Sequence, residues 1–381
     1  MLFCFAGFDL QAVLAQAPKP VPTMAYAEGS LAGRPAPATW SFVVDGDSRN
    51  CGDLIMPVIA KRAIQKGARF YWHLGDLRWL ASADQDYAGL HRNDPEALKM
   101  DNYLKAAWDD FKMNQIKPFG KVPFFLGIGN HELIGRTRAQ FVEAFHEQLN
   151  IEAIRRQREA DDPNDQTVRT YYHWMMDGID FINLDNADNM FNNAELTWVT
   201  KLIASDQANA QVRALVVGMH SALPDSYSID HSMNQGADKG MSGRIVYKQL
   251  LALKKQTGKP VYLLASHSHY FLSDIYNTGS WQGNGGVLPG WIVGTAGAQF
   301  FAVPPAVKGF TSYAENQYGY VLVTVNSSKT SRDPLQLTFI PIKQVELGPD
   351  IVNKFGVDAV HFCFSQNWRA TIYQQVTVPA N

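Results

Sequence analysis

The sequence has little cysteine, no long apolar run and no excess of charge of one sign. Among its 381 residues, 34 basic side chains stand against 36 acidic ones, a formal charge of −2. This near balance gives no electrostatic case for a nucleic acid or a membrane surface as a partner. Since no apolar run reaches the roughly 18–20 residues of a membrane span, the sequence also predicts no such span.

The three cysteines exclude a framework of disulfides or a structural zinc site. Cys4, Cys51 and Cys363 show no Cys-x-x-Cys spacing, and three residues allow one disulfide at most. They leave the redox compartment undetermined. The expectation is that all three are unpaired, small apolar side chains.

Apolar residues make up 46% of the chain and aromatic residues 12%, enough for a substantial core. We predict one domain over residues 41–345, preceded by a leader and a proline-rich lead-in (1–40). A C-terminal extension (346–381) is expected to pack on that domain. In the leader, Ala15-Gln16-Ala17 resembles an export cleavage site without the usual preceding basic residues. We interpret this segment as a truncated signal peptide, and the alternative interpretation is a disordered leader. With a signal peptide, the protein is expected to be periplasmic or secreted.

Strand-like and helix-like segments alternate through the domain. Expected strands lie at residues 41–44, 70–74, 122–128, 171–176, 180–185, 212–218, 261–265, 291–294, 320–325 and 336–340. Expected helices lie at residues 54–66, 95–113, 138–158, 194–204 and 243–256. This alternation predicts an α/β fold, a four-layer α/β/β/α sandwich with two mixed β-sheets.

Several of these expected strands end in polar side chains. The apolar run at residues 122–128 is followed directly by Gly129-Asn130-His131-Glu132. The same pattern of an apolar run followed by polar residues recurs at four other strand ends, which carry Asp47, Asp76, His220, and His267 with His269. Open α/β sheets bind ligands at the carboxyl ends of their strands. We therefore predict a site there.

The donors at these strand ends are oxygen and imidazole groups without a thiolate. Such a set suits Mn, Fe, Zn or Co rather than a structural zinc. Taken singly, Asp47 and Asp76 also fit turn residues after glycine, and His220 also fits a core or surface histidine. The occurrence of all of them at strand ends favours a metal site. Asp45 is an alternative to Asp47.

Five elements of the sequence together resemble the motifs of the calcineurin-like metallophosphoesterase superfamily. They are Gly46-Asp47, Gly75-Asp76, the Gly-Asn-His-Glu element, His220 and Ser266-His267-Ser268-His269. This superfamily includes purple acid phosphatases and many phosphodiesterases. The resemblance extends over residues 41–325. It implies a centre of two metal ions with Asp76 as the bridging ligand.

The resemblance also implies a role for each motif residue. Asn130, His220 and His267 would complete the shell of one ion. Asp47 and His269 would bind the other. His131 would donate a proton to the leaving oxygen or stabilise charge on the phosphoryl group, and Glu132 would orient His131 or a neighbouring ligand from outside the metal shell.

The sequence departs from the family pattern at three positions. Arg49 stands where the first motif commonly has histidine, and an arginine has no lone pair with which to bind a metal. We expect Arg49 to bind phosphate instead, and Arg78 to contact the substrate. Trp79 replaces the tyrosine ligand of purple acid phosphatases, so no tyrosinate–iron centre is predicted. Ser266 replaces a glycine.

The prediction from sequence is a binuclear phosphoester hydrolase that acts on a small phosphomonoester or phosphodiester by metal-activated hydroxide. One alternative is a catalytically impaired metal-binding or phosphate-binding protein on the same fold, which Arg49 favours. The other is a nucleotide anhydride hydrolase, which shares the same phosphoryl chemistry. The motifs do not predict the substrate, the metal or the oligomeric state.

Overall fold

The computed structural model of this chain describes residues 38–309 and 311–367. The expected export signal near residues 15–17 and most of the proline-rich lead-in lie outside these residues. The last part of the expected C-terminal extension also lies outside them.

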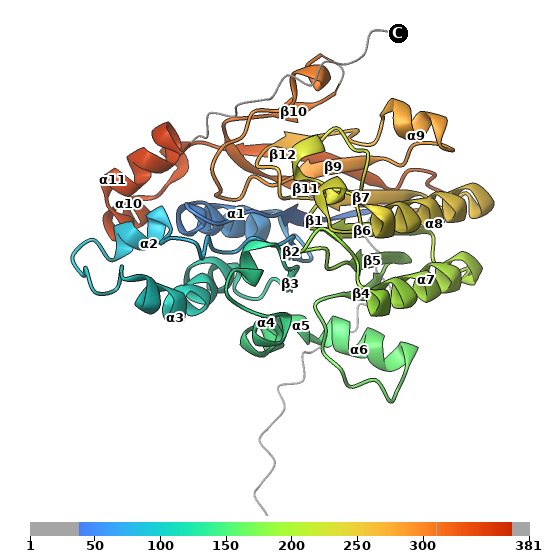
Figure 1. Cartoon of the computed structure of the whole chain (residues 1–381), viewed down its shortest axis with the longest axis horizontal. Helices are drawn as coiled ribbons and strands as arrows, with labels where there is room; N and C mark the ends of the chain where they lie inside the picture. Colours follow the sequence, from blue (N-terminus) through green and yellow to red (C-terminus); the bar gives the residue numbers. More distant parts are fainter. Residues whose placement is uncertain (1–37, 310, 368–381) are drawn as a thin grey trace, which may run out of the picture. The chain divides into compact units, whose positions relative to one another are not determined.

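The described residues form strands and helices in alternation (Figure 1). The strands are β1 (Thr39–Asp45), β2 (Tyr71–His73), β3 (Phe124–Leu126), β4 (Tyr172–Met176), β5 (Ile179–Asn183), β6 (Ala214–Met219), β7 (Val261–Ala265), β8 (Phe271–Leu272), β9 (Gly290–Val293), β10 (Tyr313–Ala314), β11 (Tyr318–Asn326) and β12 (Leu335–Ile342). The helices are α1 (Gly52–Lys66), α2 (Gln85–Leu90), α3 (Met100–Phe111), α4 (Arg138–Ala144), α5 (His146–Leu149), α6 (Glu152–Asp161), α7 (Asn193–Ala208), α8 (Met241–Thr257), α9 (Gly279–Gly283), α10 (Pro349–Phe355) and α11 (Val357–His361).

One sheet has the strand order β12-β11-β1-β2-β3 within the described residues. β1 pairs with β2 in parallel, and β2 pairs with β3 in parallel, whereas β11 and β12 run antiparallel to their neighbours. The predicted strand–helix–strand unit is therefore present as β1–α1–β2. Its parallel strands bring the carboxyl ends of β1, β2 and β3 to the same edge of the sheet.

The other sheet has the order β10-β8-β9-β7-β6-β5-β4. Strands β5, β6, β7 and β9 pair with one another in parallel. Strand β4 pairs antiparallel with β5, β8 with β9, and β10 with β8. A tight turn joins β4 to β5, with Asp177 at φ 52° and Gly178 at φ 71°, a conformation that an Asp-Gly pair favours. Both sheets are mixed, as expected.

The two sheets pack against each other through aromatic side chains. Phe125 of β3 stacks on Trp174 of β4 with ring centres 3.8 Å apart, and Phe70 meets Phe181 of β5 edge-on at 5.2 Å. The outer face of the second sheet is covered by α7 and α8, whose Ile203 and Leu250 are buried. On the other side, α1 contacts β1 and β11 (Figure 1). These layers form the predicted α/β/β/α sandwich.

One predicted helix is interrupted. The segment 138–158 forms α4, α5 and α6 rather than a single helix. The backbone leaves the helical region at Phe145 (φ −113°, ψ 26°) and again at Asn150 and Ile151. Phe145 is buried, so its packing into the core overrides the helical periodicity that the sequence shows.

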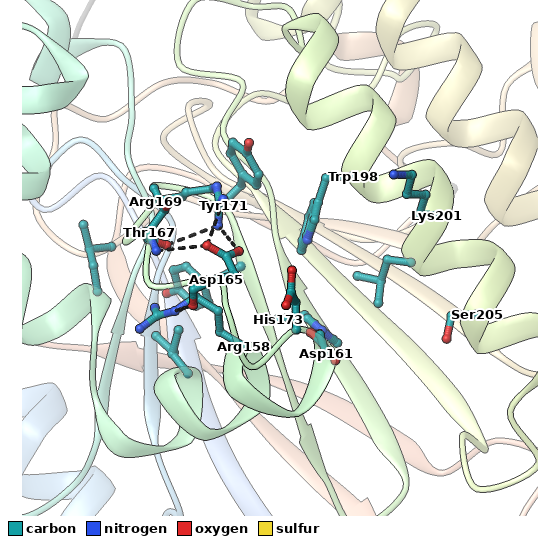
Figure 2. A pocket seen from close by; sticks show the side chains of 15 residues that line it. Arg158, Asp161, Asp165, Thr167, Arg169, Tyr171, His173, Trp198, Lys201 and Ser205 are labelled. Carbon is teal, nitrogen blue, oxygen red and sulfur yellow. Dashed lines mark hydrogen bonds and ion pairs between the residues drawn. The ribbon is translucent and has the colours of Figure 1, made fainter.

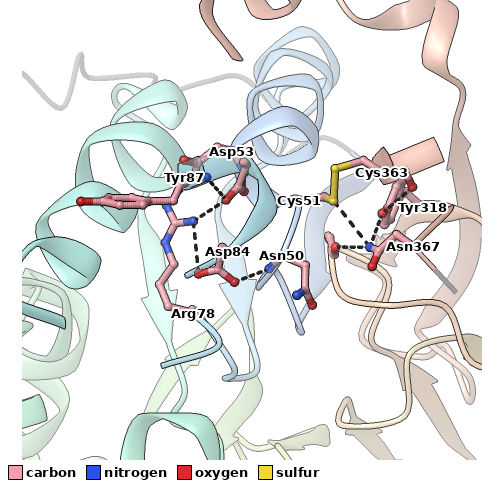
Figure 3. The surroundings of a disulfide bond; sticks show 11 residues. Asn50, Cys51, Asp53, Arg78, Asp84, Tyr87, Tyr318, Cys363 and Asn367 are labelled. Carbon is pink, nitrogen blue, oxygen red and sulfur yellow. Dashed lines mark hydrogen bonds and ion pairs between the residues drawn. A yellow bond between two sulfur atoms is a disulfide. The ribbon is translucent and has the colours of Figure 1, made fainter. Parts of the chain in front are cut away.

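The expectation of three unpaired cysteines is wrong, because Cys51 and Cys363 form a disulfide (Figure 3). The bond joins the start of α1 to the segment after α11. In the same region the Asn367 side chain donates to the Gly297 carbonyl and to the Tyr318 hydroxyl. The C-terminal helices α10 and α11 contact α2, so this segment packs on the sandwich.

None of the helices within the described ranges is both long and apolar enough to cross a membrane.

Candidate metal centre

The predicted site residues lie at strand ends of both sheets. Asp47, Asp76 and Asn130 follow β1, β2 and β3 of the first sheet. His220 follows β6, and His267 follows β7 of the second sheet. Since each strand delivers its polar residue at its carboxyl end, the two packed sheets bring these five side chains to one place.

The backbone at the site is held in an unusual conformation. Asp47, Asp76 and His267 have positive φ angles of 58°, 60° and 64°. Non-glycine residues in this region cost of order 1–3 kcal/mol each and persist only when the surrounding structure fixes them. The Asp47 amide donates to the Gly75 carbonyl at 3.0 Å, which ties the loops after β1 and β2 together. Such strain is concentrated at functional sites.

Gly129 is needed because two loops approach each other closely. A Cβ atom at this position would lie 2.3 Å from Asp76 Oδ1 and 2.8 Å from His220 Cε1. No side chain fits there without moving these two predicted ligands. The glycine before Asn130 therefore allows the loops that carry Asp76 and His220 to meet.

Four of the six predicted ligands form a compact cluster. Asp47, Asp76, His220 and His267 each offer a ligand atom within 4.8 Å of the others. The fifth, Asn130, adjoins the cluster through its Oδ1, which lies 2.9 Å from His220 Nε2. The sixth, His269, has its Nε2 3.4 Å from Asp47 Oδ1.

Around His220, hydrogen-bond acceptors converge. Its Nδ1 lies 3.0 Å from the Leu74 carbonyl, to which it donates, so Nε2 of the neutral ring carries a lone pair. This lone pair faces Asn130 Oδ1 at 2.9 Å and Asp76 Oδ1 at 3.3 Å. Three acceptors facing each other repel unless a cation lies among them. The arrangement is typical of metal ligands whose other ring nitrogen is fixed by a carbonyl.

The donor set fits a metal ion on two further counts. Asp47 Oδ1, Asp76 Oδ2 and His267 Nδ1 are buried and have no hydrogen-bond partner within the described ranges, although buried polar atoms normally have one. In addition, ligand atoms bound about 2.1 Å from one ion lie about 3.0–3.4 Å apart, which matches the spacings around His220. The cluster can therefore hold a divalent ion.

The two carboxylates of the cluster differ in their electrostatics. Burial raises the pKa of Asp47 to about 7, although the nearby His220 lowers it in part. Burial also acts to raise the pKa of Asp76, but electrostatic interactions with His220, His131 and Arg49 outweigh the effect of burial and hold that pKa well below its usual value. Asp76 is therefore a charged carboxylate at the centre of the site.

His131 and Glu132 have separate positions. His131 donates from Nδ1 to the Trp79 carbonyl at 2.6 Å, which turns Nε2 toward Asp76 Oδ2, 3.8 Å away. Glu132 is buried and accepts from the backbone amides of Asp76, Leu77 and Gly129 at 2.8–2.9 Å. It thus supports the loop that presents Asp76, whereas the orientation of His131 comes from Trp79.

The structure separates the two arginines that the sequence suggested for substrate binding. Arg49 lies at the cluster, between Asp76 and His269. Arg78 does not: its side chain is fully buried among Asp53, Asp86 and Asp110. A substrate cannot reach this side chain, so the expected contact with Arg78 is not compatible with its position.

Asp45, the alternative to Asp47, is also placed away from the cluster. It accepts from the Gly46 amide at 2.9 Å and from the Thr295 amide at 2.8 Å. Both bonds fix the loops around the site. Between the two aspartates, the structure brings Asp47 to the other ligands.

Sequence reasoning missed the groups that orient the histidines. The carbonyls of Leu74, Trp79 and Gln299 accept from His220, His131 and His269, the last at 2.6 Å. Phe301 stacks on His269 with ring centres 4.0 Å apart. A backbone carbonyl has no signature in the sequence, and Phe301 lies in a segment without a recognisable motif. Only the folded arrangement reveals them.

A cavity lies among residues that do not belong to the metal cluster, and Figure 2 shows the side chains that line it. It has a volume of about 480 Å³, and its walls include Tyr171, Trp198 and His173. Arg169 and Asp165 pair with each other at its rim, at 2.6 Å. His173 and Asp161 at the same cavity also pair with each other, so these groups do not form a set of unsatisfied ligand atoms like that of the metal cluster.

Comparisons with known proteins agree with this geometry at the level of the fold. No family model and no curated protein matches the chain. A solved purple acid phosphatase from yellow lupin matches at a TM-score of 0.52 and 17% identity, over 80% of this chain and 51% of that one. A PhoD structure matches at a TM-score of 0.51 and 13% identity, over 86% of this chain and 78% of that one. The chain spans about half the length of the lupin phosphatase.

These likenesses show the fold. The chain has the calcineurin-like metallophosphoesterase fold, with two mixed sheets and an Asp/His cluster at the strand ends. The resemblance that the motifs carried is confirmed at this level. Fold alone does not define an activity, so the function has to be argued from the cluster itself.

Proposed function

We propose that this protein is a metal-dependent hydrolase of small phosphoesters, either monoesters or diesters. The observation that carries the proposal is the convergence of ligand atoms from Asp47, Asp76, His220 and His267, with Asn130 beside them. Asp47, Asp76 and His267 each have one buried ligand atom without a hydrogen-bond partner among the described residues. An ion bound there would supply Lewis acidity to a phosphoryl oxygen and make a bound water acidic near neutral pH. The donor set suits Mn, Fe, Zn or Co.

The chain's own residues provide the remaining parts of the chemistry. His131 holds its Nδ1 proton on the Trp79 carbonyl and presents Nε2 next to the Asp76 carboxylate. When protonated at Nε2, the ring can give that proton to a leaving oxygen or stabilise charge on the phosphoryl group. Its side chain keeps 12% exposure, so a substrate can reach it.

Asp76 and its supports keep the site in position. The Asp76 side chain also accepts from the His131 amide at 3.0 Å, which links the two residues directly. Glu132 fixes the backbone on both sides of that contact. Preorganised groups of this kind need no rearrangement at the moment of reaction, which is the main source of electrostatic catalysis.

Hydrolysis of an aryl phosphate, a bis-aryl phosphate and a nucleoside triphosphate, each with Mn, Zn or Fe, tests the proposal. We expect metal-dependent turnover of an ester that falls about 100-fold or more in His131→Ala, with the bound metal retained. The control is His146→Ala, which removes an exposed imidazole from α5 and should change nothing. Cleavage of the nucleoside triphosphate alone would favour a nucleotide anhydride hydrolase. A lack of turnover with every metal would favour a binding protein.

We also propose that the protein is periplasmic or secreted. The Cys51–Cys363 disulfide supports this, because such bonds persist mainly in oxidising compartments. Thiol alkylation and mass spectrometry on cell fractions test it. Protein found in the cytosol with both thiols reduced would contradict the proposal.

A further inference from the structure

Arg49 occupies an unusual place at the metal cluster. It comes from the loop after β1, two residues beyond Asp47, and it is buried with 8% exposure. Its Nε lies 3.4 Å from Asp76 Oδ2, and its Nη2 lies 3.0 Å from His269 Nε2. The guanidinium therefore spans the gap between these two side chains.

The tautomer of His269 defines what this contact is. The ring donates from Nδ1 to the Gln299 carbonyl at 2.6 Å, so its Nε2 carries the lone pair. Arg49 has donors and no lone pair, and its Nη2 therefore donates to Nε2. The lone pair through which His269 would bind a metal is already used by the guanidinium.

A second ion would need the same atoms. Beside the cluster of Asp47, Asp76, His220 and His267, the further predicted ligand atom is His269 Nε2. It would have to share a second ion with Asp47 Oδ1 and Asp76 Oδ2, which have no hydrogen-bond partner among the described residues. His269 Nε2 lies 3.4 Å from Asp47 Oδ1, and Arg49 lies between His269 and Asp76 Oδ2. A second ion and the guanidinium cannot both lie there, since both are cations and both require the His269 lone pair.

Charge and packing favour the guanidinium. One divalent ion together with Arg49 more than balances the two buried carboxylates, and a second divalent ion would add a large excess of positive charge in a buried site. Arg49 is also held from a third side, because its guanidinium lies 5.6 Å from the centre of the Trp79 ring. Movement out of the site would break all three contacts.

We propose that the centre binds a single metal ion and that the Arg49 guanidinium takes the place of the second one. This inference rests on the proposed function. In this single-ion centre, Arg49 supplies a fixed positive charge and a planar set of N–H donors. A two-metal enzyme would supply a Lewis acid at the same place. Such donors match the geometry of a phosphoryl group, so the arrangement preserves anion recognition with one ion.

Counting the bound metal tests this inference without any assay of activity. Wild-type protein is loaded with excess Mn, freed of loose metal by gel filtration, and analysed by elemental mass spectrometry and electron paramagnetic resonance. We expect about one Mn per chain and the six-line signal of an isolated ion. Arg49→His restores the common Asp-x-His motif, and we expect about two Mn per chain with an exchange-coupled signal.

Arg49→Lys is the matched control, because it keeps the positive charge and adds no metal ligand when protonated. We expect it to bind about one Mn, like the wild type. Two coupled ions in the wild type, or no bound ion, would overturn the inference. So would an Arg49→His variant that folds as the wild type does, by circular dichroism, and still binds one ion.

The two proposals fail in different ways. Two ions with metal-dependent turnover would overturn the single-ion centre and leave the hydrolase in place. One ion per chain without turnover of any phosphoester would leave the single-ion centre in place and argue against the hydrolase.

Discussion

Arg49 and Arg78 lie in neighbouring strand-end loops, and both are buried beside carboxylates, yet their surroundings differ in kind. Arg78 bonds to Asp53 at 2.5 Å and to Asp86 at 3.0 Å, and also to Asp110 (Figure 3 shows part of this group). Arg49 instead meets one carboxylate and one imidazole. Both arginines are thus buried cations, but the side chains that bind them differ.

The difference that matters is whether the carboxylate oxygens accept hydrogen bonds. Every carboxylate oxygen around Arg78 accepts a hydrogen bond. For example, Asp53 accepts hydrogen bonds from the side-chain amides of Asn114 and Gln115 as well as from Arg78. In the metal cluster, one oxygen of Asp47 and one of Asp76 have no such partner in the described part of the chain. A satisfied buried network stabilises a fold, whereas an unsatisfied one is incomplete without a ligand.

The largest effect on stability is expected when Arg78 is removed. Arg78→Met leaves several buried carboxylates without their cation, and breaking a buried pair in this way costs about 3–5 kcal/mol. Urea unfolding measures the change. Arg156→Met, which removes an exposed arginine paired with Glu152 on α6, is the control and should cost less than about 1 kcal/mol. Equal losses would mean that the Arg78 network has no special role in stability.

The disulfide lies between the two clusters along the chain, since Cys51 follows Arg49 and precedes Asp53. It joins residues 312 positions apart in the sequence, and a cross-link of this kind stabilises by about 2–4 kcal/mol. We expect reductant to lower the unfolding midpoint of the wild type by a corresponding amount. Cys363→Ala should start at the lower midpoint and be insensitive to reductant. A wild type that is indifferent to reductant would contradict the bond.

The parts of this molecule that the sequence predicts are those in which the signal is local. A short apolar run followed by a polar residue identifies a strand and its end within a few positions, so Asp47, Asp76 and His220 were found with their strands. The layered fold follows from the alternation of such units. The short strands β8 and β10, of two residues each, are too short to give a periodic pattern.

The parts that the sequence does not predict depend on distant contacts. Nothing near Cys51 indicates a partner 312 positions away. Arg49 and Arg78 look alike in sequence, and their roles separate only when α1 and α3 bring Asp53 and Asp110 to Arg78. The positive φ angles of Asp47 and Asp76 likewise have no local signature, because only a small share of non-glycine residues, aspartates included, adopt that conformation.

The smallest effect on stability should come from the metal cluster, and this outcome would separate the two networks most sharply. Asp47→Asn removes a buried negative charge. Oδ1 of Asp47 has no hydrogen-bond partner among the described residues. The side-chain oxygen of the asparagine can still accept the hydrogen bond from the backbone amide of His267. We expect the metal-free protein to unfold within about 1 kcal/mol of the wild type, as functional sites trade stability for activity. Metal affinity should fall by more than about 100-fold, since even partners of ligands contribute 10- to 100-fold.

The matched change in the other network is Asp53→Asn, which weakens the ion pair with Arg78. It should cost about 1–3 kcal/mol and leave metal binding unchanged. Urea unfolding in a chelator and calorimetric titration with Mn give both quantities for each variant. If Asp47→Asn destabilised the metal-free protein as much as Asp53→Asn does, its carboxylate would be a structural group. Carboxylate oxygens without a hydrogen-bond partner would then not indicate a ligand site in this protein.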